Sequence, residues 1–478
     1  MTTTTAPATD QSADTEGHVL VWRRPADLAA HPLNVRHDLG DLTGMVKTIR
    51  TVGVIQPFVI VPTADGEKVL AGHRRLAAAV EAGTELVPCY VRPDLADDVS
   101  QVTAMLVENG QRRDLSVTEE AQGYQQLAAF EVSAAQIAKA TGRKLGHVKT
   151  ALVVAGSDVA LAVTDRYDLT LDQAATLAEF ADDADAVKDL TVTAKRDPRG
   201  WDHVVSRLRQ DRADAQAAAE LVAQLTEAGV TVVDRHDLAD AAVSISDLLD
   251  TDGNRIIPET HAACPGHMAA VVKDWSGVGA AYFCTDPKGH GHADRFKNRS
   301  AAAAPMSDEQ KEERRDVVAN NRAWRAAQPV RHEFVKSLVA RRTPPKGTLR
   351  WVTEAVVTSP SQLDKADEDF LAALCGTKPG THWQRTSGPS AAAAATDARL
   401  PLVLFAQVSA AVEKSMEHPC WRNSTAEQAR YLTFLAEVGY ATSEVEQLVI
   451  DTHAAKAARR RTRKATGPAG HEEASDAA

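Results

Sequence analysis

The sequence has few aromatic residues, few cysteines and no long apolar run. Aromatic residues make up 5% of the 478 residues, and only 5 residues are cysteine. So few, widely spaced cysteines cannot form the disulfide framework of a small secreted protein, and thiol or metal chemistry explains them better. No apolar stretch is long enough to cross a bilayer, and the threonine-rich N-terminus lacks the hydrophobic segment of a signal peptide. We therefore expect a cytoplasmic protein with no membrane partner.

An excess of positive charge is also missing. The formal net charge is −11, which argues against binding to DNA through a positive potential spread over the whole surface. Local basic patches remain able to bind nucleic acid, so the sign of the total does not exclude a DNA-binding protein. The length is sufficient for two to four domains.

One short segment has the residue types of a phosphate site. Gly72 lies between an apolar run ending at Ala71 and the alanine-rich run 76–81, a pattern that predicts a turn from a strand into a helix. A glycine in such a turn lets backbone N–H groups approach a ligand, and the new helix presents the positive end of its dipole. Arg74 and Arg75 add forked donors that suit phosphate. Taken alone, the segment is explained equally well as a surface turn with solvated arginines.

A second segment, 108–113, supplies complementary groups. Its sequence is Glu-Asn-Gly-Gln-Arg-Arg, in which Glu108 is a candidate Mg²⁺ ligand and Asn109 provides an amide that accepts or donates hydrogen bonds. Together the two segments predict a nucleoside-triphosphate site without a Walker-type glycine loop.

Residues 32–152 resemble the ParB partition-protein family. Three motifs occur in the family's order: residues 53–57 (Gly-Val-Ile-Gln-Pro) are similar to its Gly-x-x-Gln-Pro motif, residues 72–75 (Gly-His-Arg-Arg) to its Gly-Glu-Arg-Arg motif, and residues 108–112 to its Glu-Asn-x-x-Arg motif. The resemblance covers only the first half of the chain. It implies an α/β, ParB/sulfiredoxin-like N-terminal unit that binds CTP with Mg²⁺.

The resemblance also implies a role for each matching residue. Gly53 and Gln56 lie near the base, and Glu108 and Asn109 serve the metal and the triphosphate. The remaining nucleotide-binding residues are Gly72, His73, Arg74 and Arg75 at the phosphates and Arg112, which helps to hold its segment. His73 stands where the family has glutamate. Because this exchange removes a carboxylate, we expect nucleotide binding with at most a weak CTPase activity.

The clearest DNA-binding pattern lies between Ser133 and Gly156. A helix over 133–140, a turn at 141–143 and a second helix over 145–154 have helix-turn-helix spacing, and no acidic residue occurs in this range. A helix of this kind fits the major groove, while flanking cations bind phosphate. The alternative is a helical hairpin that binds no DNA, in which His147 is a packed side chain. The candidate DNA-binding residues are Arg143, Lys144, His147, Lys149 and Thr150.

Cysteine and histidine gather once more, in residues 264–292. Cys264-Pro265-Gly266-His267 is followed by Cys284 and then by His290 and His292. Two thiols and two imidazoles from two loops suffice for a tetrahedral structural zinc site. We expect the ligands to be Cys264, His267, Cys284 and either His290 or His292. Unligated thiols and surface histidines explain the pattern equally well.

Composition and periodicity divide the chain into six parts. We expect a disordered tail (1–17), a ParB-like nucleotide-binding domain (18–114), a helix-turn-helix domain (115–212), a small domain with the zinc site (213–300), a mostly helical region with mobile connectors (301–455), and a basic then acidic tail (456–478). The connectors expected to be mobile are 296–305 and 377–395. The expected fold class is therefore an α/β unit, then a mainly helical DNA-binding domain, then a mixed, mostly α C-terminal half.

These patterns and the resemblance predict a DNA-segregation protein. It would be a homodimer, associated with the nucleoid or a plasmid, that recognises a palindromic site in double-stranded DNA and acts as a CTP-responsive clamp. A ParA-type ATPase is the partner that the resemblance implies, although the family's short basic and apolar N-terminal peptide is not seen. Two alternatives remain open: a ParB-like transcription regulator without a partition role, and a ParB-like nuclease.

Overall fold

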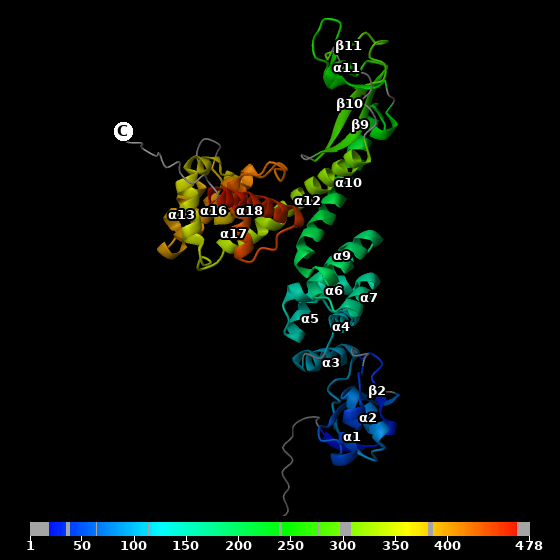
Figure 1. Cartoon of the computed structure of the whole chain (residues 1–478). Coiled ribbons are helices and arrows are strands. Elements are labelled where there is room, and N and C mark those ends of the chain that lie inside the picture. Colours follow the sequence, from blue (N-terminus) through cyan, green and yellow to red (C-terminus); the bar gives the residue numbers. More distant parts are fainter. Residues whose placement is uncertain are drawn as a thin grey trace, which may run out of the picture. The chain divides into compact units, whose positions relative to one another are not determined.

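The structure is a computed structural model that describes residues 19–34, 39–63, 65–112, 115–238, 241–274, 277–296, 307–380 and 386–465 (Figure 1). Within these ranges the side chains of 110–112, 236, 362 and 460–465 are not described. The chain forms two compact units, Met1–Arg196 and Asp197–Ala478. The expected tail at 1–17 lies outside the described residues, as does 466–478 of the expected C-terminal tail.

The first unit begins with a mixed five-stranded sheet in the order β1-β5-β3-β4-β2. β1 pairs antiparallel with β5, whereas β5 and β3 run parallel. Apolar residues at helical spacing turn one face of each helix onto this sheet, where Ile49 and Leu76 meet Phe58 and Ile60. The α/β fold expected for this segment is confirmed. Its strands and helices are β1 (Val19–Arg23), β2 (Ala29–Ala30), α1 (Thr43–Val52), β3 (Phe58–Thr63), β4 (Gly66–Ala71), α2 (His73–Ala82) and β5 (Val87–Val91).

Seven helices complete the first unit. Capping boxes begin α4 at Ser116, α5 at Ser133 and α8 at Thr170. In each, the capping hydroxyl accepts a hydrogen bond from the backbone N–H three residues later, and the side chain of that later residue accepts one from the backbone N–H of the capping residue. Gly142, with φ 70°, ends α5. The helices are α3 (Asp98–Arg112), α4 (Val117–Ala129), α5 (Ala134–Thr141), α6 (Leu145–Ala155), α7 (Asp158–Tyr167), α8 (Leu171–Glu179) and α9 (Ala184–Arg196).

The second unit starts with the long helix α10 (Trp201–Glu227), which packs beside α12 (Asp308–Val339) (Figure 1). The domain boundary expected after residue 212 falls inside α10, because its alanine-rich sequence continues the helix. Asp214 on α10 binds Lys273 at 2.6 Å and also Arg325 of α12.

A small β module follows α10. Its four-stranded sheet has the order β6-β9-β10-β7, and a separate pair joins β8 to β11. Figure 1 shows β9 and β10 as a long hairpin with α11 and β11 beyond one end. The elements are β6 (Thr231–Val232), β7 (Val243–Ser244), β8 (Leu248–Leu249), α11 (Pro258–His261), β9 (His267–Asp274), β10 (Gly277–Cys284) and β11 (Ala293–Asp294).

The C-terminal helices of the second unit bury a core that includes Trp324, Phe405 and Leu432. The connector expected at 377–395 is wrong over Ser387–Ala394, since this alanine-rich stretch forms α15. Residues 381–385 of that connector, and 297–305 of the one before α12, lie outside the described residues. Besides α12, the helices are α13 (Thr348–Thr358), α14 (Glu368–Cys375), α15, α16 (Leu400–Ser415), α17 (Ala426–Glu437) and α18 (Glu444–Ala465). Short 3₁₀ turns occur at Pro25–Asp27, Pro198–Gly200, Arg235–Asp237, Ile245–Asp247, Pro360–Lys365 and Asp397–Arg399.

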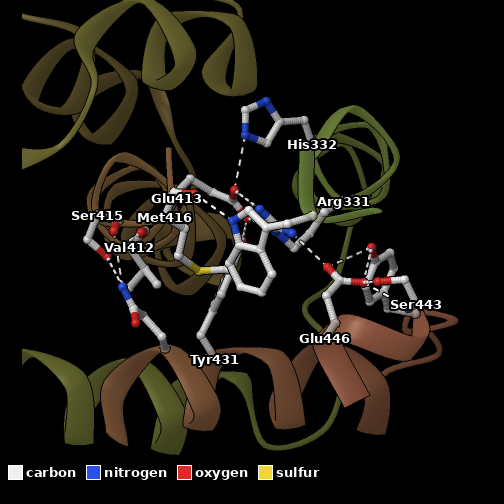
Figure 2. Close-up of polar contacts among 12 residues, drawn as sticks. Arg331, His332, Val412, Glu413, Ser415, Met416, Tyr431, Ser443 and Glu446 are labelled. Carbon is white, nitrogen blue, oxygen red and sulfur yellow. Dashed lines mark hydrogen bonds and ion pairs between the residues drawn. The ribbon is translucent and has the colours of Figure 1, made fainter. Parts of the chain in front are cut away.

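A buried ionic network joins three of these helices (Figure 2). Arg331 of α12 is 0% exposed and donates to both carboxylate oxygens of Glu413 on α16, at 2.6 and 2.8 Å. Its third bond, at 2.6 Å, reaches Glu446 of α18. Each carboxylate also accepts a hydrogen bond from a tyrosine hydroxyl: Tyr431 donates to Glu413 at 2.9 Å, and Tyr440 donates to Glu446 at 3.1 Å. Burial alone would raise the pKa of Glu413, but the guanidinium of Arg331 outweighs it and lowers that pKa to about 2.

Among the described residues no single helix is long and apolar enough to span a membrane. The sharply bent pair α6 and α7, at 103° to each other, reaches that length and apolar character only when the two are taken together.

Candidate functional site

The two segments predicted to bind a triphosphate lie around one pocket in the first unit. The pocket has a volume of about 220 Å³. Its walls come from α1, the loop before β3, the β4–α2 turn and the C-terminal part of α3. The lining residues are Met45, Gln56, Leu70, Ala71, Gly72, His73, Arg74, Arg75, Glu108 and Asn109.

Gly72 makes the turn that forms the floor of this pocket. Its φ of 108° lies in the left-handed region, and a Cβ built there would be 2.6 Å from Cδ1 of Phe58. Any other residue would therefore be both strained and in collision with a buried ring. No side chain caps the N-terminus of α2. The first N–H groups of this helix and its positive dipole end thus face the pocket without a capping oxygen.

The two arginines have different environments. Arg75 donates to the backbone carbonyls of Gln56 at 2.5 Å and Pro57 at 3.2 Å, and its guanidinium lies 5.6 Å from the centre of the Phe58 ring. These contacts tie the loop before β3 to α2. Arg74 donates to the carbonyl of Asp41 at 3.0 Å, while its buried Nε has no hydrogen-bond partner. Arg74 therefore has a donor that no neighbouring protein group satisfies.

His73 contributes no positive charge to the pocket near neutral pH. Burial lowers the pKa of His73 to about 4. A hydrogen bond with the backbone of Val69 favours the charged form, but its effect on the pKa is smaller than that of burial. Its Nε2 is buried without a partner. The environment therefore selects the neutral form of this ring.

The C-terminal part of α3 brings two oxygen-bearing side chains to the same pocket. Glu108 lines it, and Asn109 donates its amide to the Met105 carbonyl at 2.8 Å, which leaves the amide oxygen as an acceptor. A carboxylate and an amide oxygen fit Mg²⁺, which also retains water or phosphate oxygens. Arg112 ends α3, and its side chain lies outside the described residues. Gly53 is not among the lining residues; with φ 76° it ends α1.

The predicted DNA-binding face carries an acidic neighbour that the sequence pattern did not reveal. Glu120 on α4 places one carboxylate oxygen 3.1 Å from Nε of Arg143 and 3.2 Å from Nε2 of His147. The second contact has an ion-pair distance but lacks hydrogen-bond geometry. Tyr124 donates to the same oxygen at 2.5 Å. His147, predicted to be exposed, is half-buried, because α6 packs this side against α4.

The other candidate DNA-binding residues lie toward solvent. Lys144 precedes the first turn of α6 and Lys149 lies on its second turn; both are exposed. Thr150 is half-buried and donates to the Gly146 carbonyl at 3.0 Å within the helix. The sequence therefore located the basic face, but it missed Glu120 and Tyr124, which lie on a helix before the pattern and are joined to it only by packing.

The cysteine and histidine cluster lies in the second unit, and three of its members, Cys264, Cys284 and His292, are among the expected ligands. Cys264 and Cys284 come together, with sulfurs 4.0 Å apart. The histidines that join them within 4.8 Å are His261 and His292. The expected ligand His267 is not in this group, although its Nδ1 lies 2.8 Å from Nδ1 of His261. Of the two alternatives expected for the fourth ligand, the group contains His292, whereas Nδ1 of His290 lies 3.4 Å from the Cys284 sulfur.

Comparisons with known proteins agree on the N-terminal part of the chain. The family model of the ParB N-terminal domain matches residues 16–110. The chain is 40% identical over 111 residues to the chromosome-partitioning protein Spo0J of Thermus thermophilus, a match that covers 23% of this chain and 40% of that protein. It is 36% identical over 155 residues to the chromosome-partitioning protein ParB of Caulobacter vibrioides, a match that covers 31% of this chain and 50% of that protein. The chain thus spans half or less of the length of these relatives.

Two solved structures are similar to the same part. One is the C-terminally truncated chromosome-partitioning protein ParB from Caulobacter crescentus complexed to the centromeric parS site. Its sequence is 27% identical, the match covers 36% of this chain and 92% of that chain, and the TM-score is 0.28. The other is the truncated Caulobacter crescentus protein complexed with CTP-gamma-S, with 30% identity, 36% and 98% covered, and a TM-score of 0.19.

Proposed function

Since this chain belongs to the ParB family, we propose that it is a DNA-partition protein whose grip on DNA responds to CTP. In this proposal α5 and α6 act as a helix-turn-helix that recognises a palindromic site, and two copies of the chain form a clamp. The observation that supports it most directly is the convergence of Arg74, Arg75, Glu108 and Asn109 on one pocket, since these residues come from segments far apart in sequence.

The pocket has the groups that a triphosphate requires. Arg74 has an unpartnered Nε, and the uncapped α2 offers backbone N–H groups, so both can bind phosphate oxygens. Glu108 and the Asn109 amide oxygen, which line the same pocket, would hold Mg²⁺. With His73 neutral, the positive potential that attracts phosphate comes from the arginines and the helix dipole.

The volume indicates which part of the nucleotide enters. Pockets that enclose a drug-sized ligand measure roughly 300–1,000 Å³, and this one measures about 220 Å³. It is therefore suited to the phosphate end, with the sugar and base outside, near Gln56. Gln56 is exposed and its carbonyl is already held by Arg75, which fixes the loop without using the side-chain amide.

Isothermal titration with CTP and Mg²⁺ tests the nucleotide site. Arg74→Ala should weaken CTP binding by about 10- to 100-fold, because one charge-assisted hydrogen bond contributes roughly 1.5–3 kcal/mol. Arg92→Ala is the matched control, since Arg92 pairs with Asp94 at the end of β5 and does not line the pocket. Absence of heat with the unmodified chain, or equal effects of the two variants, would remove this site from the proposal.

DNA footprinting and immunoprecipitation sequencing, each with and without CTP, test the DNA-binding half. Sequence-selective retention that changes with CTP supports partition. Retention that is indifferent to CTP supports a transcription regulator, and metal-dependent cleavage of the DNA supports a nuclease. Lys149→Ala should weaken binding and reduce its salt dependence by about one phosphate contact. Lys188→Ala, an exposed lysine on α9, is the control and should change neither.

A further inference from the structure

Among its described residues, the β module of the second unit has a small apolar cluster around its two cysteines. Its buried apolar cluster consists of Ile245, Leu248, Ile256 and Cys284, with three half-buried neighbours, Val243, Cys264 and Tyr282. Small units of this kind commonly need a disulfide or a metal ion as an additional restraint. Both cysteines of this cluster are free thiols, so no disulfide supplies it.

Four potential metal ligands meet at this core. One donor atom from each of His261, Cys264, Cys284 and His292 lies within 4.8 Å of the other three. Two sulfurs bound to one tetrahedral zinc at about 2.3 Å each would be about 3.8 Å apart, and here they are 4.0 Å apart. The thiols are therefore already at a spacing that a single ion can bridge.

The histidine nitrogens provide an independent indication. His261 is 1% exposed, and its Nε2 has no hydrogen-bond partner, as is also true of Nε2 of His292. Buried polar atoms are nearly always satisfied in folded proteins, so two orphaned imidazole nitrogens beside two thiols need an explanation. A metal ion at the centre of the group would satisfy both.

The two remaining histidines support the group from outside. His267 contacts Nδ1 of His261, which fixes the orientation of that ring and leaves Nε2 for the ion. His290 lies against Gly266, where a Cβ would be 2.7 Å from its ring, and it contacts the Cys284 sulfur at 3.4 Å. Glycine at 266 is thus needed for the close approach of His290, which can then donate to a sulfur that carries charge.

We propose that His261, Cys264, Cys284 and His292 form a structural Zn²⁺ site that joins α11, the end of β10 and the loop before β11. Two thiols and two imidazoles are the donor set that zinc prefers, and two thiolates balance the charge of the ion. Binding releases one proton from each thiol. Four protein ligands leave no open coordination position, so the site restrains the module and performs no catalysis.

The test uses the untagged full chain, purified with zinc and dialysed. We expect one zinc per chain by elemental analysis. After exchange for Co²⁺, we expect the visible absorption of a tetrahedral site together with the near-ultraviolet band of thiolate ligands. Cys264→Ser and Cys284→Ser should each abolish the spectrum, whereas Cys420→Ser, which alters a cysteine outside the module, should retain it.

Two histidine pairs decide the ligand set. His261→Ala and His292→Ala should lose the ion, whereas His267→Ala and His290→Ala should keep one equivalent with roughly 10- to 100-fold weaker affinity in competition with a chelator. The proposal is overturned if the unmodified chain binds neither zinc nor cobalt after reduction of its thiols. Loss of the ion in His290→Ala with retention in His292→Ala overturns the ligand assignment. Because the cobalt spectrum of the unmodified chain is one of the readouts, a variant that fails to fold does not prevent a decision.

Discussion

Removing the guanidinium of Arg331 should destabilise the C-terminal helices more than any surface charge does. Arg331→Met keeps an unbranched side chain of similar length and deletes the charge. Two carboxylates, Glu413 and Glu446, then remain 1% and 0% exposed without their cation. Their hydroxyl partners Tyr431 and Tyr440 are still present, so neither carboxylate loses every donor.

The size of the effect follows from the hydrogen bonds that this substitution removes. Three hydrogen bonds of 2.6–2.8 Å join Arg331 to the two carboxylates. Breaking a buried ion pair by removing one partner costs about 3–5 kcal/mol, chiefly because the other charge stays buried. We therefore expect Arg331→Met to lower the free energy of unfolding of these helices by about 3–5 kcal/mol at neutral pH.

Native-state hydrogen exchange in α12, α16 and α18 is the suitable assay. The chain has two compact units, so one denaturation midpoint would mix their transitions, whereas amide exchange reports each region separately. Arg350→Met is the control. Arg350 pairs with Glu354 at 2.9 Å, but the two side chains are 86% and 49% exposed, and an exposed pair contributes about 0–1 kcal/mol.

A second variant separates charge from packing. Adding Glu413→Gln and Glu446→Gln to Arg331→Met removes the stranded charges, so it should recover part of the lost stability. A loss below about 1 kcal/mol in Arg331→Met, or no recovery in the triple variant, would refute the reasoning.

Three further outcomes follow from individual interactions. Gly72→Ala should destabilise the N-terminal domain by about 1–3 kcal/mol in native-state hydrogen exchange of α2, because its Cβ would lie 2.6 Å from a buried ring carbon. Gly83→Ala, also at positive φ but with nothing within 4 Å, should cost less, and equal costs would contradict the steric argument. Glu120→Gln should raise DNA affinity severalfold in fluorescence anisotropy at fixed salt, because Arg143 loses its intramolecular partner. An unchanged affinity would count against DNA binding by the face that carries Arg143. Glu413 has a folded pKa of about 2 and an ordinary value of 4.5, so its contribution is complete above pH 4.5 and is lost as the pH falls toward 2. That contribution is about 3 kcal/mol, and acid unfolding followed by near-ultraviolet circular dichroism should show the loss in the unmodified chain but not in Glu413→Gln.

The fold class followed from local signals. The apolar run ending at Ala71 and the alanine-rich run after Gly72 predicted the turn from β4 into α2, and helix-turn-helix spacing predicted α5 and α6 close to their observed bounds. β1 was missed, because a strand of five residues at the sheet edge alternates too briefly to be distinguished from a loop. The helix α15 was missed because alanine and serine repeats are shared by helices and linkers.

The membership of each site was predicted less well than its location. The motif residues around Gly72 and Glu108 do line one pocket, because α3 packs against β4, which leads into the Gly72 turn. Spacing could not identify Glu120 as the partner of Arg143, because α4 and α6 are brought together only by tertiary packing.

The histidines of the β module show why spacing was insufficient there. The sequence favoured His267 because it follows Cys264 at the interval of a common zinc loop. In the fold, His267 is the first residue of β9 and pairs across the hairpin with Cys284, so strand geometry fixes where its side chain leaves the backbone. His261, six residues earlier at the end of α11, has a buried ring instead. In the proposed site, membership therefore depends on where a strand begins, because the one-residue register of a strand decides which face a side chain occupies.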